Sequence, residues 1–265
     1  AQPILNIKVS PGTIDRGPAS TTLQFNNADI EESPMAQMLE DRFLRQCLNV
    51  EIKKNALVKL IEQSKVTELN EFKNKKQLTL DSKLKLQGSL IVASDGIDSP
   101  SAKAIGIRKT GWKYKQRGLV CAVEHEYSSA NTAYQYFLPE GPLAILPLKN
   151  NTASIVWTES LQNASTITEM NDAEYINVLR ARFGDFLGQF KLTGKRLSFP
   201  LKLSISEKYV ADKFAVIGDA AHGYHPIAGQ GLNAGMRDIA ALVEVISSAR
   251  DRGEKFSSIN VLNRY

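Results

Sequence analysis

The amino-acid sequence predicts an α/β protein in which an α/β domain is interrupted by an antiparallel, β-rich insertion. Two apolar runs, "SLIVAS" at 89–94 and "KFAVIG" at 213–218, have the length of strands buried on both faces of a parallel sheet. Between them, residues 111–204 are rich in β-branched and aromatic residues and are divided by turn signals, which is typical of an antiparallel sheet.

Composition supports a globular protein without a membrane span. The 265 residues are 43% hydrophobic and 23% charged, and no apolar run approaches the roughly 18 residues needed to cross a bilayer. The net charge of +5 comes from scattered lysines, which indicates a solvated surface and no nucleic-acid partner, although it permits weak attraction to an anionic membrane. Two cysteines are too few for a disulfide framework and favour a reducing, cytoplasmic compartment.

The first part of the chain predicts two strands, a helix and a meander. Residues 5–10 and 21–27 have the alternation of short strands joined by a Pro-Gly turn. Short alternating stretches over 55–88 predict strands and turns. Between them, one helical face is predicted by the spacing of Met35, Met38, Leu39, Phe43, Leu44, Cys47 and Leu48.

The last part predicts two helices around a buried strand. A helix is expected around 172–187, before the apolar run at 213–218. A second helix is expected from about Gly231 to Ala249, with a stop at 251–253. Its apolar face is defined by Leu232, Met236, Ile239, Ala240, Val243 and Ile246.

The stretch "GDAAHGYHPIAGQGLNAG" at 218–235 concentrates glycines between the buried strand and the last helix. Asp219 follows the strand, where open α/β sheets bind ligands, and its carboxylate can accept a hydrogen bond from a polyol hydroxyl. Residues 229–233 form the first turn of the helix, where free N–H groups favour an anion. "GQGLNA" matches the dinucleotide fingerprint, but residues 219–228 separate it from the strand, and a purely structural turn is the alternative.

Residues 214–242 resemble the second flavin-binding motif of the FAD-dependent aromatic-ring hydroxylases, and within them the ubiquinone-biosynthesis branch. Three further segments agree in order: "LEDRFLRQCL" is similar to the helix that passes the flavin, "LIVASDGIDSPSAKAIGI" to the Asp-Gly motif, and residues 137–157 to the sheet floor of the substrate domain. The resemblance therefore implies a partial Rossmann-like FAD-binding domain interrupted by an antiparallel β-rich substrate domain. The implied parts are 1–33 (strands joining the substrate domain), 34–110 and 205–265 (FAD-binding domain) and 111–204 (substrate domain).

The resemblance also implies site residues. The carboxylate of Asp219 would bind the ribityl chain, and the backbone of Gly229 to Asn233 would lie along the flavin pyrimidine edge. Arg42 approaches the flavin or is a solvated helix residue. The residues expected to bind FAD are Asp95, Gly218, Asp219, Pro226, Gly229, Gln230, Gly231, Leu232, Asn233 and Arg42. Those expected to line or support the substrate face, with plain sheet core as the alternative, are Phe137, Pro147, Trp157 and His225.

The implied activity is that of an FAD-dependent monooxygenase with NADPH or NADH as reductant. A flavin C4a-hydroperoxide, formed from O2, would hydroxylate the aromatic ring of a polyprenylated phenol in ubiquinone biosynthesis. The flavin carries the chemistry, so no catalytic side chain is predicted. A lipid-tailed substrate implies a cytoplasmic protein at the periphery of the inner membrane, associated with the membrane surface or a biosynthetic complex.

Two departures from the family pattern keep other hypotheses open. No strand–GxGxxG–helix unit is present, so we expect a fragment that is inactive by itself, and Ala102 stands where the family carries arginine. The alternatives are a hydroxylase of a soluble aromatic and a non-catalytic scaffold that has lost FAD. His222 and His225 have H-x-x-H spacing, but His125 is the only other histidine, so no metal site is expected.

Overall fold

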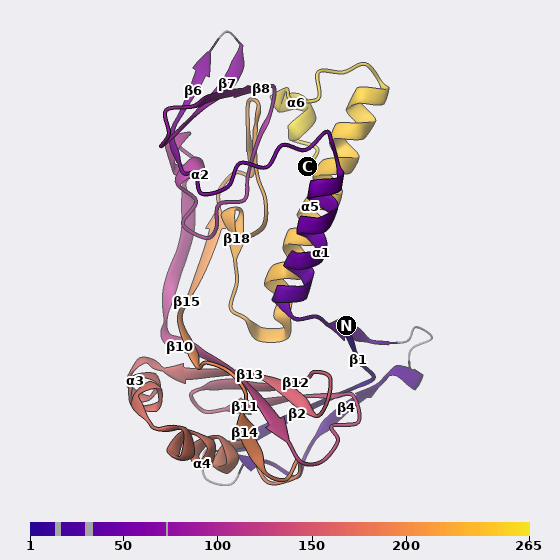
Figure 1. Cartoon of the computed structure of the whole chain (residues 1–265), viewed down its shortest axis with the longest axis vertical. Helices are drawn as coiled ribbons and strands as arrows, with labels where there is room; N and C mark the ends of the chain where they lie inside the picture. The colour runs from indigo at the N-terminus through magenta and orange to yellow at the C-terminus, as the bar shows by residue number, and fades with distance from the viewer. Residues whose placement is uncertain (14–16, 30–33, 73) are drawn as a thin grey trace. The chain divides into compact units, whose positions relative to one another are not determined.

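The computed structural model describes residues 1–13, 17–29, 34–72 and 74–265, and the chain folds as two compact units. Unit 1 comprises Ala1–Lys59 and Tyr114–Leu201, and unit 2 comprises Leu60–Lys113 and Lys202–Tyr265. The unit boundaries fall inside two long strands labelled in Figure 1, β10 (Lys109–His125) and β15 (Leu197–Ser206). Residues 34–59, which the sequence groups with 60–110, are part of unit 1.

Unit 1 is built on a sheet of mainly antiparallel strands. β10, β13, β12 and β11 pair antiparallel in that order, whereas β2 joins β11 in parallel. β4 and β3 pair with β2, β14 pairs with β10, and β1 pairs with β5. The elements are β1 (Gln2–Ile4), β2 (Asn6–Thr13), β3 (Gly17–Pro18), β4 (Leu23–Asn26), η1 (Asn27–Asp29), β5 (Ala36–Met38), α1 (Asp41–Lys54), β11 (Thr132–Leu138), β12 (Gly141–Pro147), β13 (Thr152–Ser160), α3 (Leu161–Glu169), α4 (Asp172–Phe183) and β14 (Phe190–Leu192).

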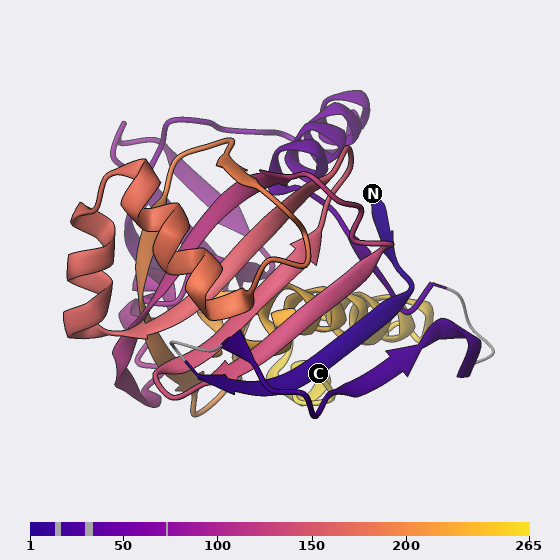
Figure 2. The ribbon, with the colours of Figure 1, turned by 90° about the horizontal axis from the view of Figure 1, so that it is seen from below.

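Helices α3 and α4 cover one face of this sheet, and Figure 2 shows them lying across the strands. Alternation along β13 places Ala153, Ile155 and Trp157 on the covered face, where they pack with Leu179 and Phe183 of α4. α4 was predicted and is confirmed, and a capping box at its start explains its sharp beginning. α3 was not predicted, because its nine residues bury only two side chains.

Helix α1 begins later than its apolar spacing predicts. Met38 belongs to β5, which pairs with β1, and the helix starts at Asp41. The spacing cannot show this pairing, because β1 lies more than thirty residues earlier in the chain. α1 buries none of its side chains, so the predicted apolar face of Phe43 and Leu48 is exposed within this chain.

Unit 2 contains the parallel pair that the sequence predicts. β17 runs parallel to β9, with Val216 opposite Ala93, and β16 pairs antiparallel on the other side of β17. β17 is buried on both faces as predicted, but Val92 of β9 is 41% exposed, so β9 is covered on one face only. The elements are β6 (Val66–Phe72), β7 (Lys75–Leu80), β8 (Lys85–Gly88), β9 (Ile91–Ala93), α2 (Pro100–Ala104), β16 (Val210–Ala211), β17 (Phe214–Val216), η2 (Gly218–Ala220), β18 (His222–Gly223), η3 (Ile227–Gly229), α5 (Gln230–Asp251) and α6 (Ile259–Leu262).

The predicted last helix is confirmed as α5, but of its predicted apolar face Ile246 packs inward while most of the rest is exposed. Gly235, Asp238 and Leu242 lie on the inner side, and Leu242 packs with Ala215 of β17. The apolar stripe of Leu232, Met236, Ile239 and Val243 is exposed within this chain. No helix in the described part of the chain is long and apolar enough to cross a bilayer.

A buried ion pair joins β13, α3 and α4 in unit 1. The carboxylate of Glu159 lies 3.2 Å from the guanidinium of Arg182, and their side chains are 1% and 8% exposed. Oε1 of Glu159 also accepts a hydrogen bond from Trp157 Nε1, and Oε2 accepts one from Asn163. The guanidinium lies 4.6 Å from the centre of the Trp157 ring. Each charge is therefore compensated only by its partners, because water is excluded.

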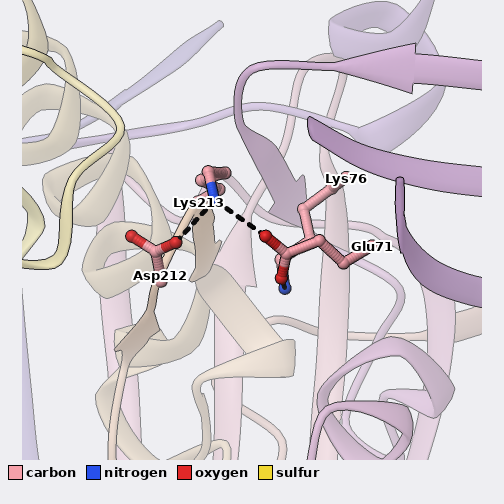
Figure 3. Close-up of polar contacts among 4 residues, drawn as sticks. All are labelled: Glu71, Lys76, Asp212 and Lys213. Atoms are coloured by element: carbon pink, nitrogen blue, oxygen red, sulfur yellow. Dashed lines mark hydrogen bonds and ion pairs between the residues drawn. The ribbon is translucent and has the colours of Figure 1, made fainter. Parts of the chain in front are cut away.

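A second charged cluster fixes the turn between β16 and β17 in unit 2 (Figure 3). The ammonium of Lys213 contacts Asp212 at 2.7 Å and Glu71 of β6 at 3.0 Å, and its side chain is 4% exposed. Lys76 of β7 lies 3.5 Å from the same glutamate. The backbone of Lys213 donates to Ser257 and accepts from Ile91 at the start of β9. This lysine therefore joins the β6–β7 hairpin to the parallel pair.

We predict that Glu159→Gln lowers the free energy of unfolding by about 3–5 kcal/mol, because it leaves the buried guanidinium of Arg182 uncompensated. Urea denaturation followed by circular dichroism measures the change. Asp185→Asn is the matched control, since it breaks an exposed pair with Arg180 on the same helix. It should cost less than about 1 kcal/mol. Equal losses in the two variants would contradict the prediction.

The Lys213 cluster predicts a pH dependence of stability. Hydrogen bonding to Lys213 lowers the pKa of Glu71 from its ordinary 4.5 and that of Asp212 from 3.8, so these carboxylates stabilise the fold above pH 4.5 and lose that effect as the pH falls. Hydrogen bonding to Asp212 raises the pKa of Lys213 from its ordinary 10.5, so its contribution is complete below pH 10.5 and is lost at higher pH.

Lys213→Met should therefore flatten the loss of stability between pH 6 and pH 3.5 relative to the wild type, as measured by urea denaturation at each pH. Lys83→Met is the matched control, because Lys83 also occupies a turn with positive φ but forms no ion pair with another described residue. If the free energy of unfolding of Lys213→Met falls between pH 6 and pH 3.5 as steeply as that of the wild type, Lys213 is not the cause of the lowered pKa values of Glu71 and Asp212.

Candidate functional site

The candidate site lies in unit 2, at the carboxyl ends of β9 and β17. Because these strands are parallel neighbours, the segments that follow them start from the same edge of the sheet. The N–H of Ile217 donates to the carbonyl of Ala93, which extends the pairing to the last residue before the turn. Asp95 follows β9, and Asp219 follows β17.

A tight turn presents Asp219. Gly218 has φ +58°, a left-handed conformation that favours glycine, and the N–H of Ala221 closes the turn on its carbonyl at 2.8 Å. The Asp219 side chain is exposed, and its carboxylate has no hydrogen-bond partner among the residues that the structure describes. This carboxylate is available to a ligand.

Asp95 is held differently. One of its oxygens accepts a hydrogen bond from the Ser99 hydroxyl at 2.5 Å and the other accepts from the N–H of Ser101 at 2.9 Å, so the carboxylate caps α2. Burial acts to raise the pKa of Asp95, but these hydrogen bonds outweigh it and lower the pKa. Direct cofactor binding by Asp95 stays a prediction, because its carboxylate already has these local partners.

A lysine stands beside the two aspartates. Lys109 of β10 donates to the carbonyl of Ile97 at 2.7 Å. Burial lowers the pKa of Lys109, while the negative charges of Asp95 and Asp219 act in the opposite direction. The sequence analysis did not single out this lysine, because the chain gives no local signal that the start of β10 returns to this edge.

The glycine-rich segment leads into α5 through left-handed backbone. Ala228 and Gly229 have φ +56° and +62°, and α5 then begins at Gln230. No side chain caps this helix, so the first N–H groups of α5 have no partner within the helix and can bind an anion. Gly231 has helical backbone, which any residue with a side chain can adopt, so its conformation does not require glycine.

Around the ends of β9 and β17 and the start of α5, four glycines leave open space beside their backbone. At Gly96, Gly218, Gly229 and Gly231, an added Cβ would meet no heavy atom within 4 Å. By contrast, a Cβ at Gly235 would lie 3.2 Å from the Cα of Gly218, so Gly235 serves close packing. We refer to these four glycines, which follow the two strands or start α5, as the glycine cradle, because a flat ligand can approach the backbone at each of them. This cradle and the free carboxylate of Asp219 fit the ribityl and ring parts of a flavin.

Asp238, which the sequence analysis did not select, connects the turn to α5. Its Oδ2 accepts a hydrogen bond from the N–H of Gly218 at 2.7 Å and lies 2.8 Å from Nε2 of His222. Asp238 lies seven residues after Gly231 and three after Gly235, which places it on the same helical face. This spacing from Gly231 and Gly235 could have indicated that Asp238 lies near the site. The apolar stripe of α5, however, predicts that the opposite face of the helix is buried.

The two histidines of the H-x-x-H pattern have separate partners. His222 pairs with Asp238, whereas Nδ1 of His225 accepts from the N–H of Ile227 at 3.3 Å, and burial lowers the pKa of His225. In the described ranges, no group of three or more His, Cys, Asp or Glu residues could hold a metal ion.

The other predicted flavin contacts are distributed around the start of α5. Pro226 precedes η3, and the amide of Asn233 donates to the carbonyl of Gly229 at 3.3 Å. Gln230 and Leu232 are exposed in the first turn of α5. Arg42 belongs to unit 1, where it is exposed and pairs with Glu40 at 2.9 Å, so its role toward a flavin stays a prediction.

The predicted substrate residues of unit 1 lie on opposite faces of the sheet. Trp157 is fully buried under α4, and Pro147 continues the buried alternation of β12, so both can support a surface but not line one. Phe137 lies on β11 between the buried Tyr136 and Leu138 and is exposed on the other face. Of these three, only Phe137 is open to a ligand.

Two solved structures show the same fold. The p-nitrophenol 4-monooxygenase PnpA of Pseudomonas putida superposes with a TM-score of 0.77 at 16% identity, covering 98% of this chain and 65% of that one. PqsL of Pseudomonas aeruginosa gives 0.78 at 20% identity, covering 93% and 68%. These likenesses confirm the predicted fold class, an α/β fold interrupted by a β-rich part.

Sequence relatives are named for ubiquinone biosynthesis. The chain is 36% identical over 255 residues to the ubiquinone hydroxylase UbiL of Rhodospirillum rubrum, covering 96% of this chain and 58% of that protein. It is 32% identical over 241 residues to the 3-demethoxyubiquinol 3-hydroxylase of Escherichia coli, covering 91% and 61%. The chain thus spans less than two thirds of the length of these relatives.

The family follows from the match along the chain. Residues 29–254 match the FAD binding domain family, and this is most of the chain. The chain therefore belongs to that family, and the prediction of FAD as its cofactor is confirmed.

We predict that Gly231→Ala stabilises the protein by up to about 1 kcal/mol while weakening FAD binding. Alanine is the better helix former and meets no neighbour here, but its methyl group occupies the cradle. Thermal unfolding and a fluorescence titration with FAD measure the two effects. Gly235→Ala is the control, and it should destabilise the protein, because its Cβ would press on the backbone of Gly218. Unchanged FAD affinity in Gly231→Ala would remove Gly231 from the site.

Proposed function

We propose that the protein containing this chain is an FAD-dependent monooxygenase that hydroxylates the aromatic ring of a polyprenylated phenol in ubiquinone biosynthesis. The observation that carries the proposal is the combination of a free carboxylate, Asp219, with an open glycine cradle at the carboxyl ends of two parallel strands. In this assignment, residues 34–110 and 205–265 belong to the FAD-binding domain, and residues 1–33 and 111–204 belong to the substrate domain.

Each part of the site has a physical task. The carboxylate of Asp219 accepts a hydrogen bond from a ribityl hydroxyl. The N–H groups and the helix dipole at Gly229 to Asn233 stabilise negative charge on the pyrimidine edge of a reduced flavin. Pro226 and His225 shape the loop that precedes this helix.

FAD, when bound, supplies the redox chemistry by taking electrons from NADPH or NADH and reacting with O2. The chain's own residues bind, orient and keep water away, which is why no acid, base or nucleophile of unit 2 is required in the reaction. On the substrate side, the exposed face of β11 around Phe137 offers an aromatic contact for a ring, with Trp157 and Pro147 supporting the sheet from within.

The substrate class is supported by the names of two relatives, a ubiquinone hydroxylase and a 3-demethoxyubiquinol 3-hydroxylase. A substrate with a polyprenyl tail resides in a membrane, so we assign the protein to the cytoplasmic periphery of the inner membrane, at the lipid surface or within a biosynthetic complex. The net charge of +5 favours attraction to anionic lipid.

We predict that Asp219→Ala raises the dissociation constant for FAD about 3- to 10-fold, because one hydrogen bond worth about 0.5–1.5 kcal/mol is lost. Asp219→Asn keeps an acceptor oxygen, so its dissociation constant for FAD should lie between those of the wild type and of Asp219→Ala. Glu244→Gln, an exposed change on α5, is the control. FAD affinity that is unchanged in Asp219→Ala would speak against the assignment.

Turnover separates the rival functions. Oxygen consumption and product mass should show one oxygen atom added to a polyprenylated phenol in the presence of FAD and NADPH or NADH. Hydroxylation of only short, soluble phenols would favour the hydroxylase of a soluble aromatic. A protein that binds no FAD would be the scaffold.

A further inference from the structure

Asp238 is an acidic residue in the middle of α5, and its side chain is only 14% exposed. One of its oxygens, Oδ2, interacts with two donors from the same short segment, the N–H of Gly218 and Nε2 of His222. Withdrawing a carboxylate from water is costly unless hydrogen-bond donors compensate it, and these two donors do so for Asp238.

The first donor marks the end of β17. The N–H of Ile217 donates to Ala93 of the neighbouring strand, so the pairing of β17 with β9 still includes residue 217. The next N–H, that of Gly218, turns away from the strand and donates to Asp238 at 2.7 Å. Asp238 therefore accepts the first N–H that leaves the strand pairing, that of Gly218, one residue before Asp219.

The second donor lies on the other side of Asp219. His222 is 3% exposed, its ring stacks on that of Tyr224 at 4.9 Å, and its backbone pairs with Ile205 of β15. Nε2 carries the hydrogen, since it faces a carboxylate oxygen at 2.8 Å. The two ends of the segment 218–222 thus converge on one oxygen atom of α5.

The turn and α5 also pack closely next to this contact. The space where a Cβ of Gly235 would lie is 3.2 Å from the Cα of Gly218, so the turn lies directly against the helix. Tyr209 lies on another side of His222, with ring centroids 6.0 Å apart, and it helps to exclude water. Hydrogen bonds in such an enclosed place are stronger than at the surface.

We propose that Asp238 is a positioning residue of the flavin site: it clamps both ends of the segment 218–222 to α5 and so holds the Asp219 carboxylate beside the first turn of that helix. Asp238 acts through Gly218 and His222 and does not itself touch the cofactor. The inference rests on the proposed function, in which Asp219 binds the ribityl chain.

The test compares Asp238→Ala with Asp238→Asn in the purified full-length protein that contains this chain. Alanine removes both hydrogen bonds and should raise the dissociation constant for FAD about tenfold or more, since a hydrogen bond to a charged group is worth that factor. Asparagine keeps an acceptor oxygen and should remain within about threefold of the wild type. Glu244→Gln, exposed on the same helix, should change nothing.

Hydrogen exchange gives a readout that does not depend on FAD. In the FAD-free protein, the amide of Gly218 should exchange at least about tenfold faster in Asp238→Ala than in the wild type, and Asp238→Asn should restore its protection. If Asp238→Ala does not fold, His222→Phe replaces it. That variant keeps the stacking on Tyr224 but frees one end of the clamp, and it should raise the dissociation constant about threefold.

The outcomes distinguish the two proposals. Wild-type affinity for FAD in folded Asp238→Ala or in His222→Phe overturns the positioning role and leaves the proposed function intact. A wild-type protein that binds no FAD overturns the proposed function and the positioning role together. Weakened binding, faster exchange at Gly218 and rescue by asparagine support the clamp.

Discussion

The parallel pairing of β9 with β17 is the constraint on which the rest of unit 2 depends. More than a hundred residues separate these strands in the sequence, yet Ala93 lies opposite Val216, and both carboxyl ends meet at one edge. β17 has no exposed side chain, so moving it would uncover packed residues on two faces at once. The Lys213 cluster fixes the amino end of this pair, and the turn at Gly218 begins at its carboxyl end. The site is placed where the sheet stops, because there the backbone leaves the strand pairing and is free to meet a ligand.

Glycine serves two different purposes around this edge, and the structure separates them. Gly223 and Gly235 remove side chains where two segments of the protein must touch, as the nearest atoms at 2.1 Å and 3.2 Å from an added Cβ show. Gly229 and Gly231 open toward space. Gly229 also supplies the left-handed backbone that glycine favours, whereas Gly231 is helical, so at Gly231 only a ligand would benefit from the absence of a side chain. Glycine therefore allows segments of the protein to pack closely at Gly223 and Gly235, and it leaves space for a ligand at Gly229 and Gly231. The spacing of the motif alone does not show which glycine does which.

The sequence predicted the parts of the fold that depend on local pattern. Continuous apolar runs gave β17 and its parallel partner, apolar spacing gave α5, and the dense motif at 214–242 gave the FAD-binding family. Contacts between distant segments were not predictable in this way. The predicted start of α1 was wrong, because β5 pairs with β1 and occupies the residues expected to begin the helix. The predicted buried face of α5 was largely wrong, because Gly235 and Asp238 face inward while most of the apolar stripe is exposed. A polar residue that accepts two hydrogen bonds can occupy the inner face of a helix, and hydrophobic periodicity cannot detect it.

The two carboxylates at the edge differ because of the order in which aspartate and glycine follow the strand. After β9, Asp95 comes before Gly96, and its carboxylate turns toward the start of α2, where Ser99 and Ser101 occupy both oxygens. After β17, Gly218 comes before Asp219, so the left-handed turn is made first and its N–H is taken by Asp238. The aspartate that follows has no such local donors and keeps its oxygens free. In the proposed function, the choice of Asp219 over Asp95 as the flavin ligand follows from this order, because a carboxylate that already caps a helix would have to give up those bonds to accept a new one.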